Sequence, residues 1–262
     1  MKVGTDGVLL GAWARVEHCQ HILDMGTGTG LVALMAAQRS QAHIVAIDLD
    51  ADAVAQAAEN VAASPWKERI QVLEADARKI ENGCEMLAFP LRASDLKVHN
   101  VQHDRSGGDK NFHLCFSPSG QRPKGSSFNF PLFDSILCNP PFFENSLKSP
   151  DAARTMARHT DTLSFDELAR SAARLLAPEG ELSVIIPYGR AHDMTVSAAC
   201  CGLFATRQTI IVPVEGGKPK RILMAFNREG TSHTPETLII QDKQRQYTAE
   251  YVRLVEKFYI KL

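Results

Sequence analysis

Residues 22–31 read Ile-Leu-Asp-Met-Gly-Thr-Gly-Thr-Gly-Leu, and this stretch decides the fold. Its apolar first half is typical of a buried strand, and the apolar spacing of residues 31–39 is typical of a helix. A glycine-rich turn between a strand and a helix lets a ligand approach the backbone closely, and it directs the N–H groups of the helix toward that ligand. We therefore predict that Gly26, Gly28 and Gly30 bind a cofactor.

Strand-like and helix-like segments alternate along the rest of the chain, which favours an α/β fold. Continuous apolar strands indicate a mostly parallel sheet with helices on both faces. The expected strands are 21–25, 43–48, 70–74, 133–138, 181–187, 202–214, 222–226 and 237–241, and the expected helices are about 31–39, 52–63, 165–176, 190–201 and 249–259. The stretch from about 81 to 131 has no sustained period and far exceeds the ~2–6 residues usual for α/β loops. We therefore expect a single domain over residues 1–262, with an irregular insertion at about 81–131.

The residues around the glycine turn indicate which cofactor it binds. A dinucleotide fingerprint needs a small residue at the position that Leu31 occupies. Asp24 precedes the first glycine, where a carboxylate would oppose a pyrophosphate but would attract a cationic amino-acid group. S-adenosylmethionine carries an ammonium and a sulfonium and no phosphate. The pattern therefore favours S-adenosylmethionine over a nicotinamide dinucleotide.

Further acids follow the second and third expected strands. Asp48 ends the second strand, where a carboxylate suits the ribose hydroxyls of a nucleoside. Asp76 follows the third strand and could accept a hydrogen bond from an adenine amino group. Asp50 and Asp52 are better explained as caps of the next helix, since Asp is favoured at helix N-termini. Acids at three successive strand ends thus support a nucleoside-containing cofactor.

The second informative stretch is Asn139-Pro140-Pro141-Phe142, which follows the apolar run 133–138. Two prolines fix φ and lack N–H donors, so the chain leaves the sheet in a stiff, extended turn. The Asn139 amide and the neighbouring carbonyls then point at one place, beside the aromatic ring of Phe142. Such a place suits a planar group with an exocyclic amine, although a simple proline-rich turn is the alternative.

Composition places the chain among ordinary soluble globular proteins, with 44% apolar and 23% charged residues. Neither a signal-peptide pattern nor an apolar run of about 18 residues is present, so we expect no membrane span and a cytoplasmic location. The cysteines lack a disulfide-type spacing, so we expect reduced thiols. The spacings of His99, His103, His113 and Cys115 match no zinc pattern, so we expect no metal, and separately we favour a monomer. Lys and Arg number 5 against 10 acids in residues 1–76, but 9 against 6 in residues 215–262. This gradient suits a cationic cofactor and a polyanion, unless it only reflects solvated faces.

Five short motifs complete the pattern: Lys2-Val3-Gly4-Thr5-Asp6-Gly7-Val8-Leu9-Leu10-Gly11-Ala12-Trp13, Ser64-Pro65-Trp66, Ala157-Arg158-His159-Thr160, Lys218-Pro219-Lys220-Arg221 and Phe258-Tyr259. With the glycine turn and the tetrad at 139–142, they resemble the bacterial tRNA(Val) adenine-37 N6-methyltransferases, a family of class I S-adenosylmethionine-dependent methyltransferases. The resemblance covers most of residues 1–80 and 131–262. It implies a Rossmann-like fold with a seven-stranded, mostly parallel sheet and an antiparallel last strand.

The resemblance also implies a reaction, which is methyl transfer from S-adenosylmethionine to N6 of an adenine in tRNA. The Asn139 side-chain oxygen and the Pro140 carbonyl would accept the two amine hydrogens, so that the nitrogen lone pair can turn toward the methyl group. Phe142 would stack on the base, a contact worth ~1–3 kcal/mol, with Pro141 beside it. No strong base is needed, because the proton leaves after the nitrogen has become cationic.

Further roles implied by the resemblance lie near both ends of the chain. Thr5 and Asp6 would lie over the methionine end of the cofactor, although a helix N-cap is an equal alternative for Thr5. The contacts to tRNA are expected from basic residues, unless these are merely solvated: Arg158, His159, Lys218, Lys220 and Arg221.

Two departures from the family and several rival functions stay open. The family has a short segment before the motif on which Met1 opens directly, so a truncated start is one expectation, and residues 81–131 have no counterpart in it. Ribosomal RNA guanine-N2 and protein-glutamine N5 methyltransferases use a similar tetrad on this fold. A nicotinamide-dependent oxidoreductase and a catalytically silent RNA-binding module are more distant alternatives.

Overall fold

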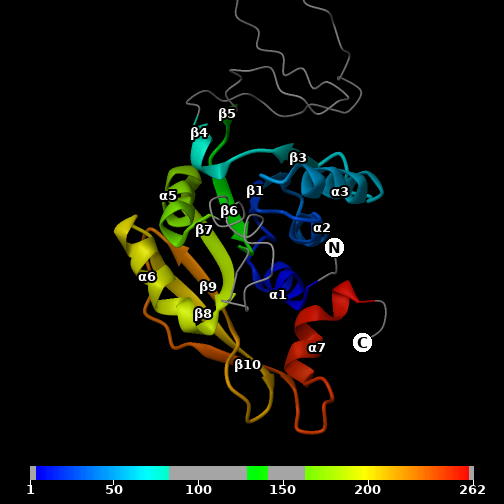
Figure 1. Ribbon diagram of the computed structural model, residues 1–262, viewed down its shortest axis with the longest axis vertical. Helices are drawn as coiled ribbons and strands as arrows, with labels where there is room; N and C mark the ends of the chain where they lie inside the picture. Colours follow the sequence, from blue (N-terminus) through cyan, green and yellow to red (C-terminus); the bar gives the residue numbers. More distant parts are fainter. Residues whose placement is uncertain (1–3, 83–128, 141–162, 260–262) are drawn as a thin grey trace, which may run out of the picture.

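The computed structural model describes residues 4–82, 129–140 and 163–259, which form a central sheet with helices around it (Figure 1). The helices are α1 (Thr5–Trp13), α2 (Leu31–Arg39), α3 (Ala51–Ala62), α5 (Phe165–Leu175), α6 (Ala191–Cys200) and α7 (Ala249–Val255). The strands are β1 (His21–Met25), β2 (His43–Asp48), β3 (Ile70–Glu74), β4 (Glu81–Asn82), β5 (Asn129–Phe130), β6 (Phe133–Cys138), β7 (Leu176–Pro187), β8 (Phe204–Val214), β9 (Arg221–Asn227) and β10 (Glu236–Gln241). Every strand and helix expected from the sequence is therefore present, with its ends shifted by a few residues.

Eight strands form the central sheet, in the order β10-β8-β9-β7-β6-β1-β2-β3. The pairs β1–β2, β2–β3, β1–β6, β6–β7 and β8–β10 are parallel, whereas β9 is antiparallel to both β7 and β8. The mostly parallel sheet is confirmed, but the expected count of seven strands is wrong. The eighth strand is Glu236–Gln241, which pairs with β8 and extends the sheet by one edge strand, while the antiparallel strand β9 lies inside the sheet between β7 and β8.

Alternate residues of the strands point into two hydrophobic clusters, one on each face of the sheet. In β1, Ile22 packs on the face covered by α1, α2 and α7, and Leu23 packs on the face covered by α5 and α6. Figure 1 shows these two groups of helices on opposite sides of the sheet. Since both faces are covered, the strand ends are where polar side chains of the sheet can reach a ligand.

The expected insertion begins and ends at neighbouring points of the fold. Strands β4 and β5 form a small parallel pair in which Glu81 lies opposite Asn129 and Asn82 opposite Phe130. The chain between them, 83–128, lies outside the described residues. One domain with an insertion at 81–131 stays a prediction, which the pairing of β4 with β5 supports.

Two general observations concern membrane and thiol chemistry. Among the helices of the described residues, none is long and apolar enough to cross a bilayer. Cys138 is a free thiol at the buried end of β6. Burial raises its pKa far above the ordinary value, and the carboxylates of Asp24 and Asp48 raise it further, so this thiol is an unreactive core group.

Candidate active site

The residues predicted to form the site lie along the edge of the sheet where parallel strands end. Gly26 follows β1, Asp48 ends β2, Asp76 follows β3 and Asn139 follows β6. These four strands are consecutive neighbours in the sheet, in the order β6-β1-β2-β3, and they run parallel. Ligands of open α/β sheets bind at this carboxyl edge. The fold therefore brings together residues that are up to 113 positions apart in the sequence.

The three glycines of the turn all have left-handed backbones, with φ of 75° at Gly26, 57° at Gly28 and 81° at Gly30. A β-carbon added at Gly26 or Gly28 would meet no other atom of the described residues within 4 Å, so these residues leave open space over both glycines. At Gly30, an added β-carbon would lie 3.4 Å from the β-carbon of Ala57, in α3. Gly26 and Gly28 thus form a cradle that a ligand can fill, whereas Gly30 also lets α3 pack against the turn.

Asp24 is a buried carboxylate at the start of this turn, with 1% of its surface exposed. Its Oδ2 accepts hydrogen bonds from the Thr27 hydroxyl (2.6 Å) and from the backbone N–H of Ala33 (3.0 Å). Burial raises the pKa of Asp24 to about 6, the two hydrogen bonds oppose that rise, and the carboxylate of Asp48 adds to it. No cation of the described residues compensates this charge. A cationic ligand over the turn would do so.

Asp48 ties the glycine turn to the end of β2. Its Oδ2 accepts from the backbone N–H of Gly28 (2.8 Å), and its Oδ1 accepts from that of Asp50 (3.0 Å). Asp50 is itself the N-cap of α3 and accepts from the N–H of Asp52 at 2.9 Å, which confirms its expected capping role. Asp48 therefore holds the cradle in shape, and its half-buried carboxylate faces the same edge of the sheet.

Asp76 lies at the expected edge but is already paired with Arg78. Its Oδ1 accepts from Nε of Arg78 (2.8 Å) and its Oδ2 from Nη2 (3.0 Å), while Nη1 of the same guanidinium reaches Glu167 at 3.3 Å. Burial raises the pKa of Asp76, but the hydrogen bonds and charge of Arg78 outweigh it and hold this pKa below its ordinary value. An adenine amino group would therefore share the Asp76 carboxylate with Arg78. The sequence analysis missed this ion pair, although Arg78 stands only two residues after Asp76.

Helix α1 brings the N-terminal motif to the same edge. A β-carbon on Gly7 would lie 3.1 Å from Cδ2 of Leu31 and 4.0 Å from Nδ2 of Asn139. Gly7 thus lets α1 pack closely against the start of α2 and the asparagine of the tetrad. The N-cap of α1 is Gly4, whose backbone is extended, so the alternative role of Thr5 as the N-cap is wrong. Thr5 is the first helical residue.

An ion pair joins α1 to β9. Nε of Arg221 lies 2.8 Å from Oδ2 of Asp6, and both side chains are about 30% exposed (28% and 30%). Arg221 begins β9 opposite Pro187, the last residue of β7. The expected contact of Arg221 with tRNA phosphate stays a prediction, and the structure gives this guanidinium a partner in the first turn of α1. No local sequence signal announces the pair, because 215 positions separate its members.

The turn between β8 and β9, residues 215–220, lies beside the end of β7, and we call it the lysine turn. Lys218 and Lys220 are exposed there. The backbone N–H of Tyr188, directly after β7, donates to the carbonyl of Lys220 at 3.1 Å, and Tyr188 is 41% exposed. Since β7 adjoins β6, these residues lie just beyond Asn139 along the edge. Sequence analysis missed Tyr188, for which an aromatic residue at a strand end was the only available signal.

The tetrad is described in its first half. Asn139 is half-buried and Pro140 is buried. The remaining predicted site residues lie outside the described residues, so that their roles stay predictions: Pro141, Phe142, Arg158 and His159. Within the described ranges, no group of three or more His, Cys, Asp or Glu side chains is arranged to hold a metal ion.

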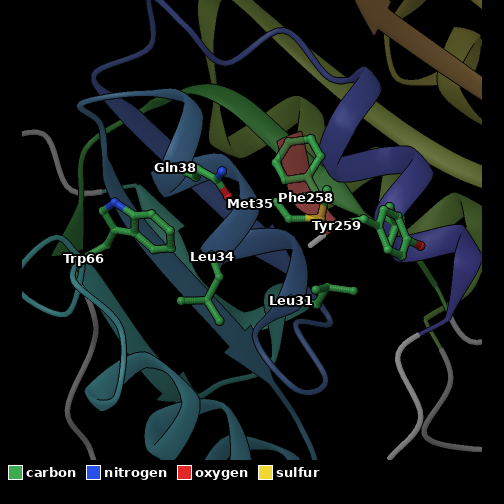
Figure 2. Close-up of a pocket in the computed structure, with 8 residues that line it drawn as sticks. Leu31, Leu34, Met35, Gln38, Trp66, Phe258 and Tyr259 are labelled. Carbon is green, nitrogen blue, oxygen red and sulfur yellow. The ribbon is translucent and has the colours of Figure 1, made fainter. Parts of the chain in front are cut away.

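A separate pocket lies on α2 (Figure 2), and its walls are almost entirely apolar. The amide of Gln38 is already used, because its Nε2 donates to the carbonyl of Lys257 at 3.0 Å. None of the three glycines of the turn lines this pocket, and no lining residue is charged, so we treat it as separate from the glycine cradle. The motif residues Trp66, Phe258 and Tyr259 serve packing here, with these other lining residues: Val8, Leu31, Leu34 and Met35.

Solved structures with the same fold define the class of protein. A predicted O-methyltransferase from Agrobacterium tumefaciens superposes with a TM-score of 0.58 at 17% identity and covers 96% of each chain. The CcbJ methyltransferase from Streptomyces caelestis has a TM-score of 0.51 at 11% identity, over 86% of this chain and 96% of that one. A family profile described as a methyltransferase domain matches residues 22–105. The protein therefore has the Rossmann-like fold of class I methyltransferases.

Curated relatives narrow this class to one family. The tRNA1(Val) (adenine(37)-N6)-methyltransferase of Phocaeicola vulgatus is 42% identical over 262 residues, which span 100% of this chain and 92% of the relative. Relatives of the same name in Trichodesmium erythraeum and Tolumonas auensis are 38% and 34% identical, over 100% of this chain and 92% and 91% of theirs. The chain belongs to the tRNA1(Val) (adenine(37)-N6)-methyltransferase family, which confirms the resemblance.

Proposed function

We propose that the protein transfers the methyl group of S-adenosylmethionine to N6 of an adenine in tRNA, at position 37 of a tRNA such as tRNA-Val. The observation that carries the proposal is the meeting of the open glycine turn, the first turn of α1 and Asn139 at one edge of the sheet. The family supports the acceptor, because its members carry this activity in their name. We expect the protein to act in the cytoplasm, on tRNA, as a monomer.

The residues at this edge fit S-adenosylmethionine, which supplies an electrophilic methyl group on a positively charged sulfur. Gly26 and Gly28 leave the space that a ligand chain needs to approach the backbone. The buried charge of Asp24 attracts the cationic half of the ligand. Asp48 would accept from the ribose hydroxyls, and Asp76, together with Arg78, would hold the adenine amino group. Each part of the ligand thus has a chemically matched group at a successive strand end.

The acceptor amine would be oriented at the tetrad. The Asn139 side-chain oxygen and the Pro140 carbonyl accept its two hydrogens, which turns the nitrogen lone pair out of the ring and toward the methyl carbon. The carbon–nitrogen bond forms as the carbon–sulfur bond breaks, and the cationic amine then loses a proton to water. Catalysis therefore comes from positioning and from preorganised polar groups. An anticodon-loop base is already unpaired, which lowers the cost of placing it there.

Thr5 and Asp6 complete the cofactor side of this arrangement. They occupy the first turn of α1, which packs on the start of α2 through Gly7. The ion pair of Asp6 with Arg221 fixes this turn against the end of β7. We therefore assign Arg221 to positioning α1, and we assign the tRNA phosphates to Lys218 and Lys220.

The buried carboxyl group of Asp24 predicts that the stability of the ligand-free protein and the affinity for S-adenosylmethionine depend on pH in opposite directions. Its folded pKa of about 6 lies above the ordinary value of 3.8, so the ligand-free protein gains stability from this group as pH falls and loses it as pH rises through about 6. The gain is at most about 3 kcal/mol. The affinity for S-adenosylmethionine should instead decrease as the pH drops below about 6, by up to about tenfold per pH unit, because the protonated acid no longer attracts a cation.

Calorimetric titration of S-adenosylmethionine between pH about 5 and about 7 checks this dependence, with Asp24→Asn as the control. The asparagine oxygen can accept the same two hydrogen bonds, so the fold should persist and the pH dependence should flatten. Equal slopes in the two proteins would remove Asp24 from cofactor binding.

The lysine turn predicts a change in the salt dependence of tRNA binding. Replacing Lys218 and Lys220 together by Ala should lower the slope of log K against log salt by about 1.4–1.8, because each lost phosphate contact removes about 0.7–0.9. Arg221→Gln is the contrasting variant, which should weaken S-adenosylmethionine binding and leave that slope unchanged. Fluorescence anisotropy over a salt series measures the slopes. The same slope decrease in Arg221→Gln would return this arginine to the RNA interface.

A methyl-transfer assay with separate acceptor pools tests the proposed function. The purified protein is incubated with methyl-labelled S-adenosylmethionine and with unmodified tRNA, ribosomal RNA or protein. The proposal expects label in tRNA. Label in ribosomal RNA would favour the guanine-N2 alternative, label in protein the glutamine-N5 alternative, and cofactor binding without any transfer the silent RNA-binding module.

A further inference from the structure

The turn that joins β10 to α7, residues 242–247, lies directly beside the lysine turn. Strands β8 and β10 run parallel, with Gln241 opposite Val214. The backbone N–H of Glu215 donates to the carbonyl of Gln241 at 2.8 Å, so the two turns leave the sheet at the same place. Figure 1 shows both at the same end of the molecule. The β10–α7 turn is therefore the outer continuation of the edge that carries the candidate active site.

This turn presents two exposed cations, Lys243 and Arg245. In the part of the chain that the structure describes, neither forms an ion pair, whereas Arg253 on α7 pairs with Glu250 at 3.2 Å. Asp242 is the acid of the turn, and its Oδ1 is turned inward to accept from the N–H groups that follow it, those of Gln244 (2.8 Å) and Gln246 (2.9 Å). Together, the two turns carry four cations against the acids Glu215 and Asp242.

The backbone of the turn holds its side chains in a defined arrangement. Arg245 has a φ of 65°, in the left-handed region that normally selects glycine or asparagine. Tyr247 follows, 47% exposed, and its ring lies on that of Tyr251, with centroids 5.1 Å apart and planes at 36°. An isolated bridge between Gln241 and Tyr247 closes the turn. One aromatic ring is thus fixed at the surface beside two cations.

Cations and exposed aromatic rings alternate along this edge from Asn139 outward. Tyr188 follows β7, the lysine turn follows β8, and Tyr247 with its cations follows β10. From β6 to β10 the sheet order crosses four strand spacings, which is about 19 Å at ~4.8 Å each. That span matches about six nucleotide steps at ~3.4 Å each. Phosphate-binding cations interleaved with stacking rings are the features by which proteins follow an RNA strand.

We propose that the β10–α7 turn is a second RNA contact, at which Lys243 and Arg245 bind phosphates and Tyr247 stacks on a base or ribose. The RNA strand that enters the site at Asn139 then runs outward over Tyr188 and the lysine turn to this turn. The proposal rests on the proposed tRNA substrate and adds to it a direction across the protein surface.

The test compares charge removal at the two opposite edges of the sheet. In the double variant Lys243→Ala/Arg245→Gly, tRNA binding should weaken roughly tenfold and the salt slope should fall by about 1.4–1.8. The melting temperature should stay unchanged or rise, because glycine relieves the left-handed strain at residue 245. The matched control is Arg15→Ala/Lys67→Ala, which removes two exposed cations before β1 and β3, at the amino edge, and should change neither quantity.

Two outcomes would overturn this inference. A wild-type protein that binds and methylates tRNA, with the double variant and the control showing the same affinity and slope, would overturn the second contact alone. A wild-type protein that neither binds nor methylates tRNA would overturn the proposed function and this inference together. Tyr247→Ala and Tyr247→Phe add an independent arm: only the alanine variant should weaken binding, by roughly tenfold or more if a base stacks there. Equal affinity in both would remove the stacking role.

Discussion

Replacing Asn139 by alanine should reduce the rate of methyl transfer by roughly 10²–10³-fold or more, the cost of losing one preorganised polar group at a reacting centre. The side chain follows β6 and lies against Gly7 of α1, at the meeting point of the segments that form the site. Without its oxygen, the acceptor amine has one hydrogen-bond partner fewer to turn its lone pair toward the methyl group. Single-turnover kinetics with saturating cofactor and tRNA measure this loss.

Two further variants decide whether Asn139 acts on chemistry or on structure. Asn139→Gln keeps the amide but displaces it, and a displacement of ~1 Å can cost about 10²-fold in rate. Ser135→Ala, on the strand that precedes Asn139, removes a buried hydroxyl that has no hydrogen-bond partner among the described residues, and it should leave the rate and the fold unchanged. Affinity for S-adenosylmethionine, from calorimetry, should stay within a few-fold in all three proteins. A joint loss of affinity and rate in Asn139→Ala would make the residue structural.

Replacing Gly28 by alanine should weaken S-adenosylmethionine binding by roughly 10–100-fold, which corresponds to a steric cost of about 1–3 kcal/mol. The added methyl group meets no other atom within 4 Å in the part of the chain that the structure describes, so it occupies space that we assign to the ligand. The left-handed backbone, at φ of 57°, adds a strain of about 1–2 kcal/mol to the folded protein itself. Calorimetry reports the first effect and thermal unfolding the second.

Gly202→Ala is the matched control for this substitution. Gly202 has a φ of 73°, and a β-carbon there also meets no atom of the described segments within 4 Å. It precedes β8, at the opposite edge of the sheet. The two variants should therefore lose similar stability, whereas only Gly28→Ala should lose cofactor affinity. Equal cofactor affinities in the two variants would contradict the assignment of the cradle.

The parts of the site that depend on the local direction of the chain could be predicted from the sequence. Gly26, Gly28 and Gly30 stand between an apolar strand and an apolar helix, and their positive φ angles follow from residue type. Asp48 and Asn139 stand where apolar runs stop, and the carboxyl ends of parallel strands meet at one edge. Short-range pattern and strand direction were sufficient for these residues.

Contacts between distant segments could not be predicted in this way. The pair of Asp6 with Arg221 joins residues 215 positions apart, and that of Arg78 with Glu167 joins residues 89 apart. No local periodicity encodes which charged side chains meet across such distances. Arg221 illustrates this limit, since the sequence places it in a basic run without revealing the carboxylate of Asp6, and its predicted phosphate contact stays a prediction.

The strand count shows a different limit. Residues 237–241 carried a recognisable strand pattern, yet the expectation of seven strands came from the family and left this strand out. The structure pairs Glu236–Gln241 with β8 as an edge strand. This addition has a functional consequence, because it carries the cations of the β10–α7 turn to the same edge as the candidate active site.

The most direct test of the central claim is mass spectrometry of nucleosides from tRNA that has been methylated with isotope-labelled S-adenosylmethionine. The substrates are an unmodified tRNA-Val transcript and the same transcript with guanine in place of adenine 37. The account predicts labelled N6-methyladenosine from the first transcript and none from the second. Label in another nucleoside, or equal N6-methyladenosine from both transcripts, would contradict it.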